Sequence, residues 1–112
     1  MRPGFFSLGF ARNQERFKPY EALGWTGDTQ LRAMDEEGID VAVIYPSRGL
    51  FALTVPALDP RLAAAIARAY NTWLYDFCAP DRQRLVGAGM ISPFDVTDAV
   101  TESRRCVHEL GF

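Results

Sequence analysis

The chain has 112 residues, of which 48% are hydrophobic, and a formal net charge of −2. This length suits one domain or part of one, and the charge excludes a strongly basic nucleic-acid-binding surface as the default function. No apolar run approaches the roughly 18 residues of a membrane helix, and the run that starts at Phe5 is too short and too rich in glycine for a secretory signal. We therefore expect a cytoplasmic protein with no nucleic-acid partner and no membrane partner.

Residues 1–27 show neither a helical nor a strand period. Aromatic residues alternate there with glycine, proline and charged residues. We expect an irregular aromatic-rich segment that packs on a larger body, followed by a structured part over residues 28–112. Phe17, Tyr20 and Trp25 suit either ordinary packing, which we favour, or the wall of a pocket or subunit contact.

The first predicted helix covers Thr29–Glu37, with Asp28 as its N-cap and Gly38 at its end. The β-branched run 39–45 follows and predicts a strand. Its apolar residues are nearly continuous rather than alternating, which is typical of a strand covered on both faces in a parallel sheet.

The connection over residues 46–58 is long and apolar. Long loops after parallel strands are where α/β proteins place binding surfaces. Asp59 is expected to cap, and Pro60 to open, a helix that runs to about Cys78. Its apolar residues recur with a helical period and are expected to form core: Leu62, Ile66, Ala69, Tyr70, Trp73, Leu74 and Phe77.

A second buried strand is predicted over residues 85–91, and a last helix begins with Asp95 as its cap and ends before Gly111. The alternation of helices and strands predicts right-handed crossovers and a parallel sheet. The inner face of the last helix is expected to consist of Val96, Ala99, Val100, Ser103, Val107 and Leu110.

Cys78 and Cys106 are far apart in the sequence. Two distant cysteines form neither a disulfide framework nor a metal-binding motif. We expect two separate structural thiols.

Two strands and three helices leave much apolar surface without a partner. A (β/α)8 barrel needs eight strands and about 250 residues. The predicted fold class is therefore α/β, as a partial (β/α)8 TIM-barrel fragment with two parallel strands and three helices.

Several segments between about residue 26 and residue 112 stand in a distinctive collinear order: LRAMDEEGIDVAVIYP (31–46), DP (59–60), AIARAYNTWL (65–74), RLVGAGMISP (84–93), DAV (98–100) and HELGF (108–112). Together they resemble the amidohydrolase-related proteins, the "amidohydrolase 2" group that includes aminocarboxymuconate-semialdehyde and resorcylate decarboxylases.

This resemblance implies a metal-dependent barrel enzyme, commonly with zinc, that hydrolyses or decarboxylates small carboxylate-bearing substrates. The family's ligands include a His-x-His or acidic-x-His pair on the first strand, but residues 1–27 contain no such pair. His108, the single histidine, lies in the last predicted helix, where surface or packing roles are expected. We therefore expect no metal ligands and no catalytic residues within this chain, and a divalent metal only in the full-length family.

Three polar residues follow the two predicted strands and are candidates for substrate contact. Arg48 is the best of them, because its planar guanidinium matches both oxygens of a carboxylate, although a loop arginine also serves to fix backbone. Ser47 and Ser92 suit turn or capping roles as well, and neither has a base nearby in sequence that would make it a nucleophile.

Three hypotheses remain open. The chain is part of a family enzyme, inactive alone and needing the missing barrel half. In the second hypothesis the chain is a non-catalytic interaction protein derived from such a barrel, which self-associates through the edges of its sheet. The third, a small self-standing flavodoxin-like module, is weakest, because that fold needs five parallel strands.

Overall fold

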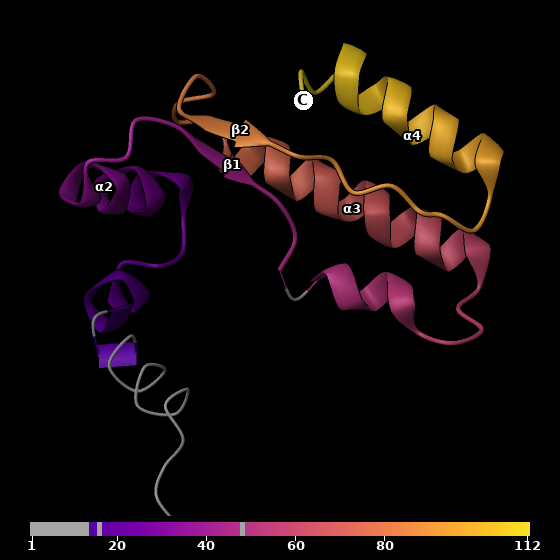
Figure 1. Cartoon of the computed structure of the whole chain (residues 1–112), viewed down its shortest axis with the longest axis horizontal. Coiled ribbons are helices and arrows are strands. Elements are labelled where there is room, and N and C mark those ends of the chain that lie inside the picture. The colour runs from indigo at the N-terminus through magenta and orange to yellow at the C-terminus, as the bar shows by residue number, and fades with distance from the viewer. Residues whose placement is uncertain (1–13, 16, 48) are drawn as a thin grey trace, which may run out of the picture.

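A computed structural model of the chain shows an α/β fold with a two-stranded parallel sheet (Figure 1). It describes residues 14–15, 17–47 and 49–112. The elements in chain order are α2 (Gly27–Glu37), β1 (Ala42–Ile44), the 3-10 helix η1 (Gly49–Thr54), α3 (Pro60–Phe77), β2 (Leu85–Gly87) and α4 (Val96–His108).

The N-terminal part differs from the prediction. Residues 14, 15 and 17–22 are helical, where an irregular segment was expected over residues 1–27; residues 1–13 lie outside the described part. Phe17 and Trp25 meet edge to face, with ring centroids 6.1 Å apart, yet both stay largely exposed. None of the described residues of this short helix is buried, which agrees with the absence of a hydrophobic period there.

Helix α2 begins two residues earlier than predicted. The Oγ1 atom of Thr26, not the carboxylate of Asp28, caps it by accepting from the backbone N–H of Thr29 at 3.3 Å. Asp28 lies in the first turn, where the helix dipole favours an acidic side chain. At the other end Gly38 adopts φ +69°, a left-handed conformation, so the predicted C-terminus is confirmed.

The caps of the two later helices are confirmed. The Oδ1 atom of Asp59 accepts from the backbone N–H of Leu62, and Asp95 does the same for Asp98, each at 2.9 Å. Pro60 opens α3 as predicted, because its missing N–H would have no partner in the first turn.

The two strands are parallel, as predicted, but each is only three residues long. Ala42 lies opposite Leu85 and Ile44 opposite Gly87. The predicted strands were longer, over residues 39–45 and 85–91. Among the described residues β1 and β2 pair only with each other. Each strand is therefore assigned only over the three residues that form this one ladder of hydrogen bonds.

One face of this sheet is covered and the other is not. Leu85 and Gly87 are buried, and a Cβ atom on Gly87 would lie 2.6 Å from the Phe112 ring. On the opposite face Val43 is 58% and Val86 36% exposed. No element of the described part covers that second face, so the cover predicted for both faces is present on one face only.

The predicted core stripe of α3 is only partly correct. Leu74 is fully buried, and Ile66, Tyr70 and Phe77 are half-buried against the core. Leu62, Ala69 and Trp73 are exposed instead. The buried line runs one position further round the helix, through Ala63, Ala67, Asn71, Leu74 and Cys78.

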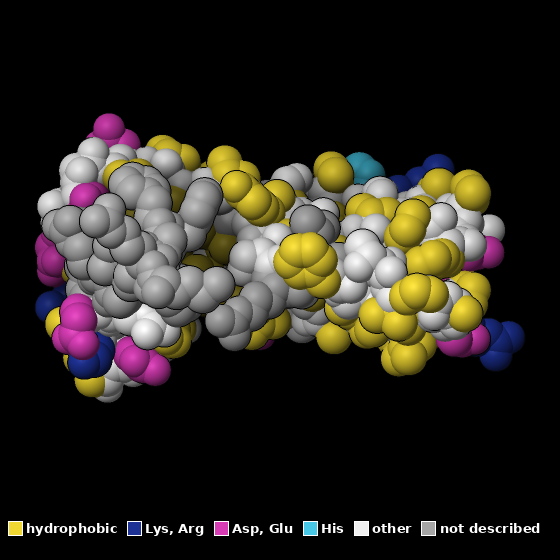
Figure 2. Space-filling view, turned by 60° about the horizontal axis from the view of Figure 1, so that its bottom comes forward, with side chains coloured by type: hydrophobic (Ala, Val, Ile, Leu, Met, Phe, Trp, Pro, Cys, Tyr) yellow, Lys and Arg dark blue, Asp and Glu magenta, His cyan; other side chains and the backbone are white. Residues whose placement is uncertain are grey.

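The predicted inner face of the last helix is mostly wrong, since only Ala99 and Leu110 of its six residues are partly buried. Its buried residues are Glu102 and Cys106, whereas Val96, Val100 and Val107 are exposed. Helix α4 packs on α3 through a polar contact, so its valine stripe has no partner among the described residues. Hydrophobic side chains gather on the surface over the half of the molecule away from the grey residues in Figure 2.

No helix in the described ranges is long and apolar enough to cross a membrane. Cys78 and Cys106 are both buried and neither forms a disulfide, so the prediction of two separate thiols is confirmed.

Candidate functional site at the carboxyl end of the sheet

The parallel pairing brings the segments that follow β1 and β2 to the same edge of the sheet. The first contains η1, and the second runs from Ala88 to Asp95 at the start of α4. In parallel α/β proteins this carboxyl edge is where ligands bind. We therefore take it as the candidate site.

The three candidate substrate residues lie differently at this edge. Ser47 is exposed, and Arg48 lies outside the described residues. Ser92 is 3% exposed, and its hydroxyl has no hydrogen-bond partner in the part of the chain that the structure describes. A buried hydroxyl without a partner costs about 1–3 kcal/mol, and Ser92 carries this cost among the described residues.

The side chain of Asn71 next to this edge is 0% exposed and makes three hydrogen bonds. Its Nδ2 group donates to the carbonyl oxygen of Met90 at 2.9 Å, and its Oδ1 atom accepts from the Met90 N–H at 2.7 Å. One side chain of α3 thus satisfies both backbone polar groups of a residue that follows β2.

Asn71 is held in turn by Glu102 of α4. The Nδ2 group of Asn71 donates a second hydrogen bond to Oε1 of Glu102 at 2.9 Å. Arg105 donates to the same oxygen at 2.6 Å, and Arg68 reaches the other carboxylate oxygen at 3.3 Å. A buried carboxylate needs such partners, because desolvation without them costs several kcal/mol.

Apolar contacts join the two loops of the site. Leu53 of η1 and Met90 belong to one buried cluster, which also contains Ala63 and Ala67 of α3. Tyr70 packs against this cluster and against the neighbouring one round Leu74 and Cys78. Both loops after the strands are therefore anchored on the same helix.

Burial raises the pKa of three groups around this helix. Desolvation disfavours the charged form of Tyr70, and the nearby Cys78 thiol adds to this effect on its pKa. Burial likewise raises the pKa of the thiols of Cys78 and Cys106. All three groups stay neutral near neutral pH, so none of them is an activated nucleophile.

Sequence reasoning did not find Asn71 or Glu102. Asn71 stands among apolar residues on one face of α3, and a buried amide at such a position is a sign of a specific hydrogen-bonded network. Glu102 lies on the side of α4 opposite the valine stripe, which hydrophobic periodicity assigns to solvent.

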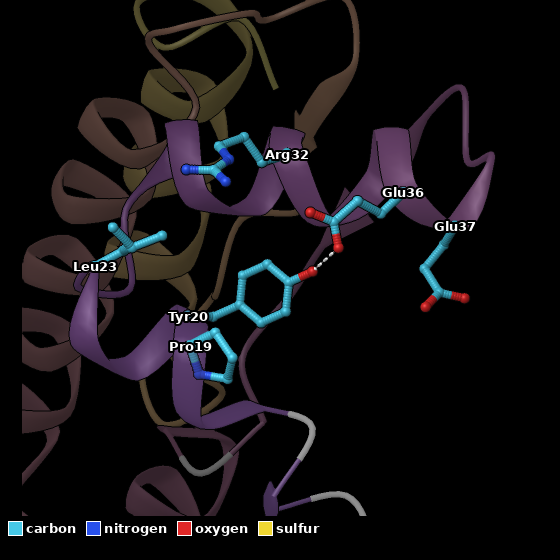
Figure 3. A pocket seen from close by; sticks show the side chains of 6 residues that line it. All are labelled: Pro19, Tyr20, Leu23, Arg32, Glu36 and Glu37. Atoms are coloured by element: carbon cyan, nitrogen blue, oxygen red, sulfur yellow. Dashed lines mark hydrogen bonds between the residues drawn. The ribbon is translucent and has the colours of Figure 1, made fainter.

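A separate pocket of 320 Å³ lies between the N-terminal helical segment and α2 (Figure 3). The hydroxyl of Tyr20 donates to the Glu36 carboxylate across it. The α2 residues that line it precede the amino end of β1, so this pocket is not at the carboxyl edge. Its lining consists of Pro19, Tyr20, Leu23, Arg32, Glu36 and Glu37.

The described residues do not fit a metal site. No three His, Cys, Asp or Glu side chains come together within the described ranges, whereas a catalytic zinc normally takes three protein ligands. His108 is exposed at the end of α4. These residues offer no donor set on which a metal-dependent step could be built.

Comparison with known proteins gives a consistent picture. The amidohydrolase family profile matches residues 16–112, so the likeness starts about ten residues before the point expected from the sequence. Gamma-resorcylate decarboxylases from Rhizobium sp. (strain MTP-10005) and Rhodococcus jostii (strain RHA1) are 36% and 37% identical to the chain over 86 residues, which are 76% of the chain. A third, from Rhizobium radiobacter, is 35% identical over the same length.

The chain spans about a quarter of the length of these curated relatives. The family profile nevertheless covers most residues of this chain, including α2, both strands, α3 and α4. The chain belongs to the amidohydrolase family.

Proposed function

We propose that this chain supplies consecutive βα units to the wall of a metal-dependent (β/α)8 barrel that decarboxylates a small carboxylate-bearing substrate. Hydrolysis of a carbon–nitrogen bond is the other reaction of this family class. The names of the three matching relatives, all gamma-resorcylate decarboxylases, favour decarboxylation.

The observation that carries this proposal is the one-sided cover of the sheet. The described helix α3 and the C-terminal Phe112 lie on one face, and Val43 and Val86 are exposed on the other. Parallel sheets are found almost only with both faces covered. In a barrel wall the helices lie outside and the second face of each strand points into the packed interior.

In this proposal the carboxyl edge of β1 and β2 is part of the catalytic face. Arg48 follows β1 and would bind the substrate carboxylate through two parallel hydrogen bonds. Ser47 and Ser92 would contribute hydroxyl groups at the same edge. The metal that the family uses would be held by residues outside the described part, since no donor set is found here.

An exchange chimera tests the proposal. The 86 matching residues of the Rhizobium sp. enzyme are replaced by those of this chain, and metal content and decarboxylation of gamma-resorcylate are measured. We expect a folded, metal-loaded and active chimera. A chimera with an Arg48→Met substitution serves as the matched probe and is expected to raise KM more than it lowers kcat. A folded chimera without metal or activity would contradict the proposal.

The second candidate function is self-association without catalysis. The exposed apolar residues of α3 and α4 favour it, because Trp73 is 51% and Val96 79% exposed. Sedimentation of the purified chain separates the two. A defined dimer of the purified chain, together with an exchange chimera that has no activity, supports self-association. An active chimera supports the enzyme.

A further inference from the structure

The backbone that follows β2 leaves the sheet after one more hydrogen bond. The Ala88 N–H donates to the carbonyl of Ile44 at 2.8 Å, which is the last bond of the ladder. At Met90 both backbone polar groups are taken up by Asn71 instead. A side chain of α3 thus replaces the neighbouring strand as the partner of this backbone.

The orientation of the Asn71 amide is determined by its surroundings. The Glu102 carboxylate, which pairs with Arg105 at 2.6 Å, can accept hydrogen bonds but cannot donate them. The Nδ2 group of the Asn71 amide must therefore face it. The Oδ1 atom then faces the Met90 N–H. A flipped amide would place two acceptors together and leave the Met90 N–H unsatisfied.

We propose that Asn71 is the positioning residue of the segment Met90–Ser92, acting through the backbone of Met90 and oriented by Glu102. This deepens the proposed function, on which it rests for the claim that the segment lies on the catalytic face. Met90 also shares a buried cluster with Leu53 of η1 and with Ala63 and Ala67 of α3. By holding Met90 on α3, Asn71 thus bears on the packing of η1 as well.

The test is performed on the ¹⁵N-labelled full chain and needs no activity. In Asn71→Ala the Met90 amide loses its acceptor, so its proton resonance moves upfield and its exchange with solvent becomes roughly tenfold faster or more. Amides of α2 and the N-terminal half of α3 are expected to keep their wild-type exchange rates. A purely stabilising residue would instead accelerate the exchange of all protected amides together.

Two controls share the network but do not touch Met90. Thr72→Ala removes a hydroxyl that accepts from Arg105 at 2.7 Å, one residue along the same helix. Glu102→Gln keeps an acceptor for Asn71 while it removes the charge. Both are expected to leave the Met90 amide resonance and its relative protection unchanged.

A rescue variant covers the case in which Asn71→Ala does not fold. In Asn71→Asp with Glu102→Gln, one carboxylate oxygen still accepts from the Met90 N–H, and the other can accept from the glutamine amide. The donor to the Met90 carbonyl is not replaced, so this variant restores the N–H contact alone. We expect the Met90 amide to regain its protection in this double variant. An unchanged Met90 amide in Asn71→Ala, loss of protection spread over all amides, or unfolding of both Asn71 variants while Thr72→Ala folds would overturn the proposal. An inactive exchange chimera would contradict the proposed function and leave this positional result standing.

Discussion

Arg84 joins the end of α2 to the start of the sheet through Asp35. Its guanidinium donates to Oδ1 of Asp35 at 2.7 Å and to the carbonyl oxygens of Ile39 and Asp40 at 2.9 and 3.0 Å. Three acceptors on the chain before β1 are thus bound by one side chain placed just before β2. This planar contact aligns the amino ends of the two strands.

Arg84→Lys is expected to lower the free energy of unfolding by about 1–3 kcal/mol, because an ammonium group cannot reach three acceptors in one plane. Chemical denaturation followed by far-UV circular dichroism measures this change. Asp35→Ala is the matched control. The Asp35 side chain is 63% exposed, so its loss should cost less than about 1 kcal/mol. Equal losses for the two variants would show that the carbonyl contacts contribute nothing.

The buried carboxylate of Glu102 gives a second pair of variants. Its side chain is 8% exposed, and Arg105, its closest partner, is 11% exposed. Glu102→Ala removes the buried carboxylate that Arg105 and Asn71 share, while Arg105 keeps Thr72 and Asn71 keeps Met90 as partners. Because the buried arginine loses its closest negative charge, we expect a loss of about 3–5 kcal/mol in the free energy of unfolding.

Arg68→Ala is the comparison for that variant. Arg68 reaches the same carboxylate at 3.3 Å, but its side chain is 58% exposed. Water replaces such a partner at little cost, so we expect a loss below about 1 kcal/mol. If Arg68→Ala were as damaging as Glu102→Ala, the interaction energy would reside in the exposed pair instead of the buried one.

The two buried thiols predict a dependence of stability on pH. Burial raises the pKa of Cys78 and Cys106 above the ordinary value of 9.0. The folded state therefore favours the neutral thiol, so this stabilisation is fully present below pH 9.0 and is lost as the pH rises through the folded-state pKa values. We expect the free energy of unfolding to fall above that pH.

A variant with both cysteines changed to alanine isolates this effect. It is less stable at neutral pH because methyl-sized side chains leave space in the core, but its stability should fall less steeply above pH 9.0. Thiol modification gives an independent measure, since both thiols should react slowly in the folded chain and rapidly in denaturant. A thiol that reacts at the same rate in both states would not be buried.

Local signals in the sequence predicted much of this fold. Asp59 and Pro60 at the start of α3, and Gly38 at the end of α2, act through contacts within four residues, so no knowledge of the rest of the molecule is needed. The strand pairing followed from the alternation of elements, and its parallel direction is confirmed.

The faces of the helices could not be predicted in the same way. Hydrophobic periodicity identifies the apolar stripe of α4, but Val100 is 44% exposed while Glu102 is buried. Which stripe is buried depends on the partner, and α3 presents Asn71 to α4. The site residues were missed for this reason, because a buried amide and carboxylate become recognisable only when the two helices are placed together.

The uncovered sheet face gives the sharpest test of how this chain is used. Val43 is 58% exposed, and its cross-strand neighbour Val86 is 36% exposed. In the chain alone Val43→Lys should change the free energy of unfolding by less than about 0.5 kcal/mol, because the new charge stays in water. In the exchange chimera the same side chain would point into the packed interior of a barrel, where an unpaired charge is not tolerated.

We therefore expect Val43→Lys to leave the helical circular dichroism of the chain unchanged and to abolish folding of the chimera. Leu85→Lys is the matched control on the opposite face, where the side chain is 1% exposed, and it should unfold both proteins. A chimera that tolerates Val43→Lys would place this face in solvent. The two strands would then not be part of a closed barrel.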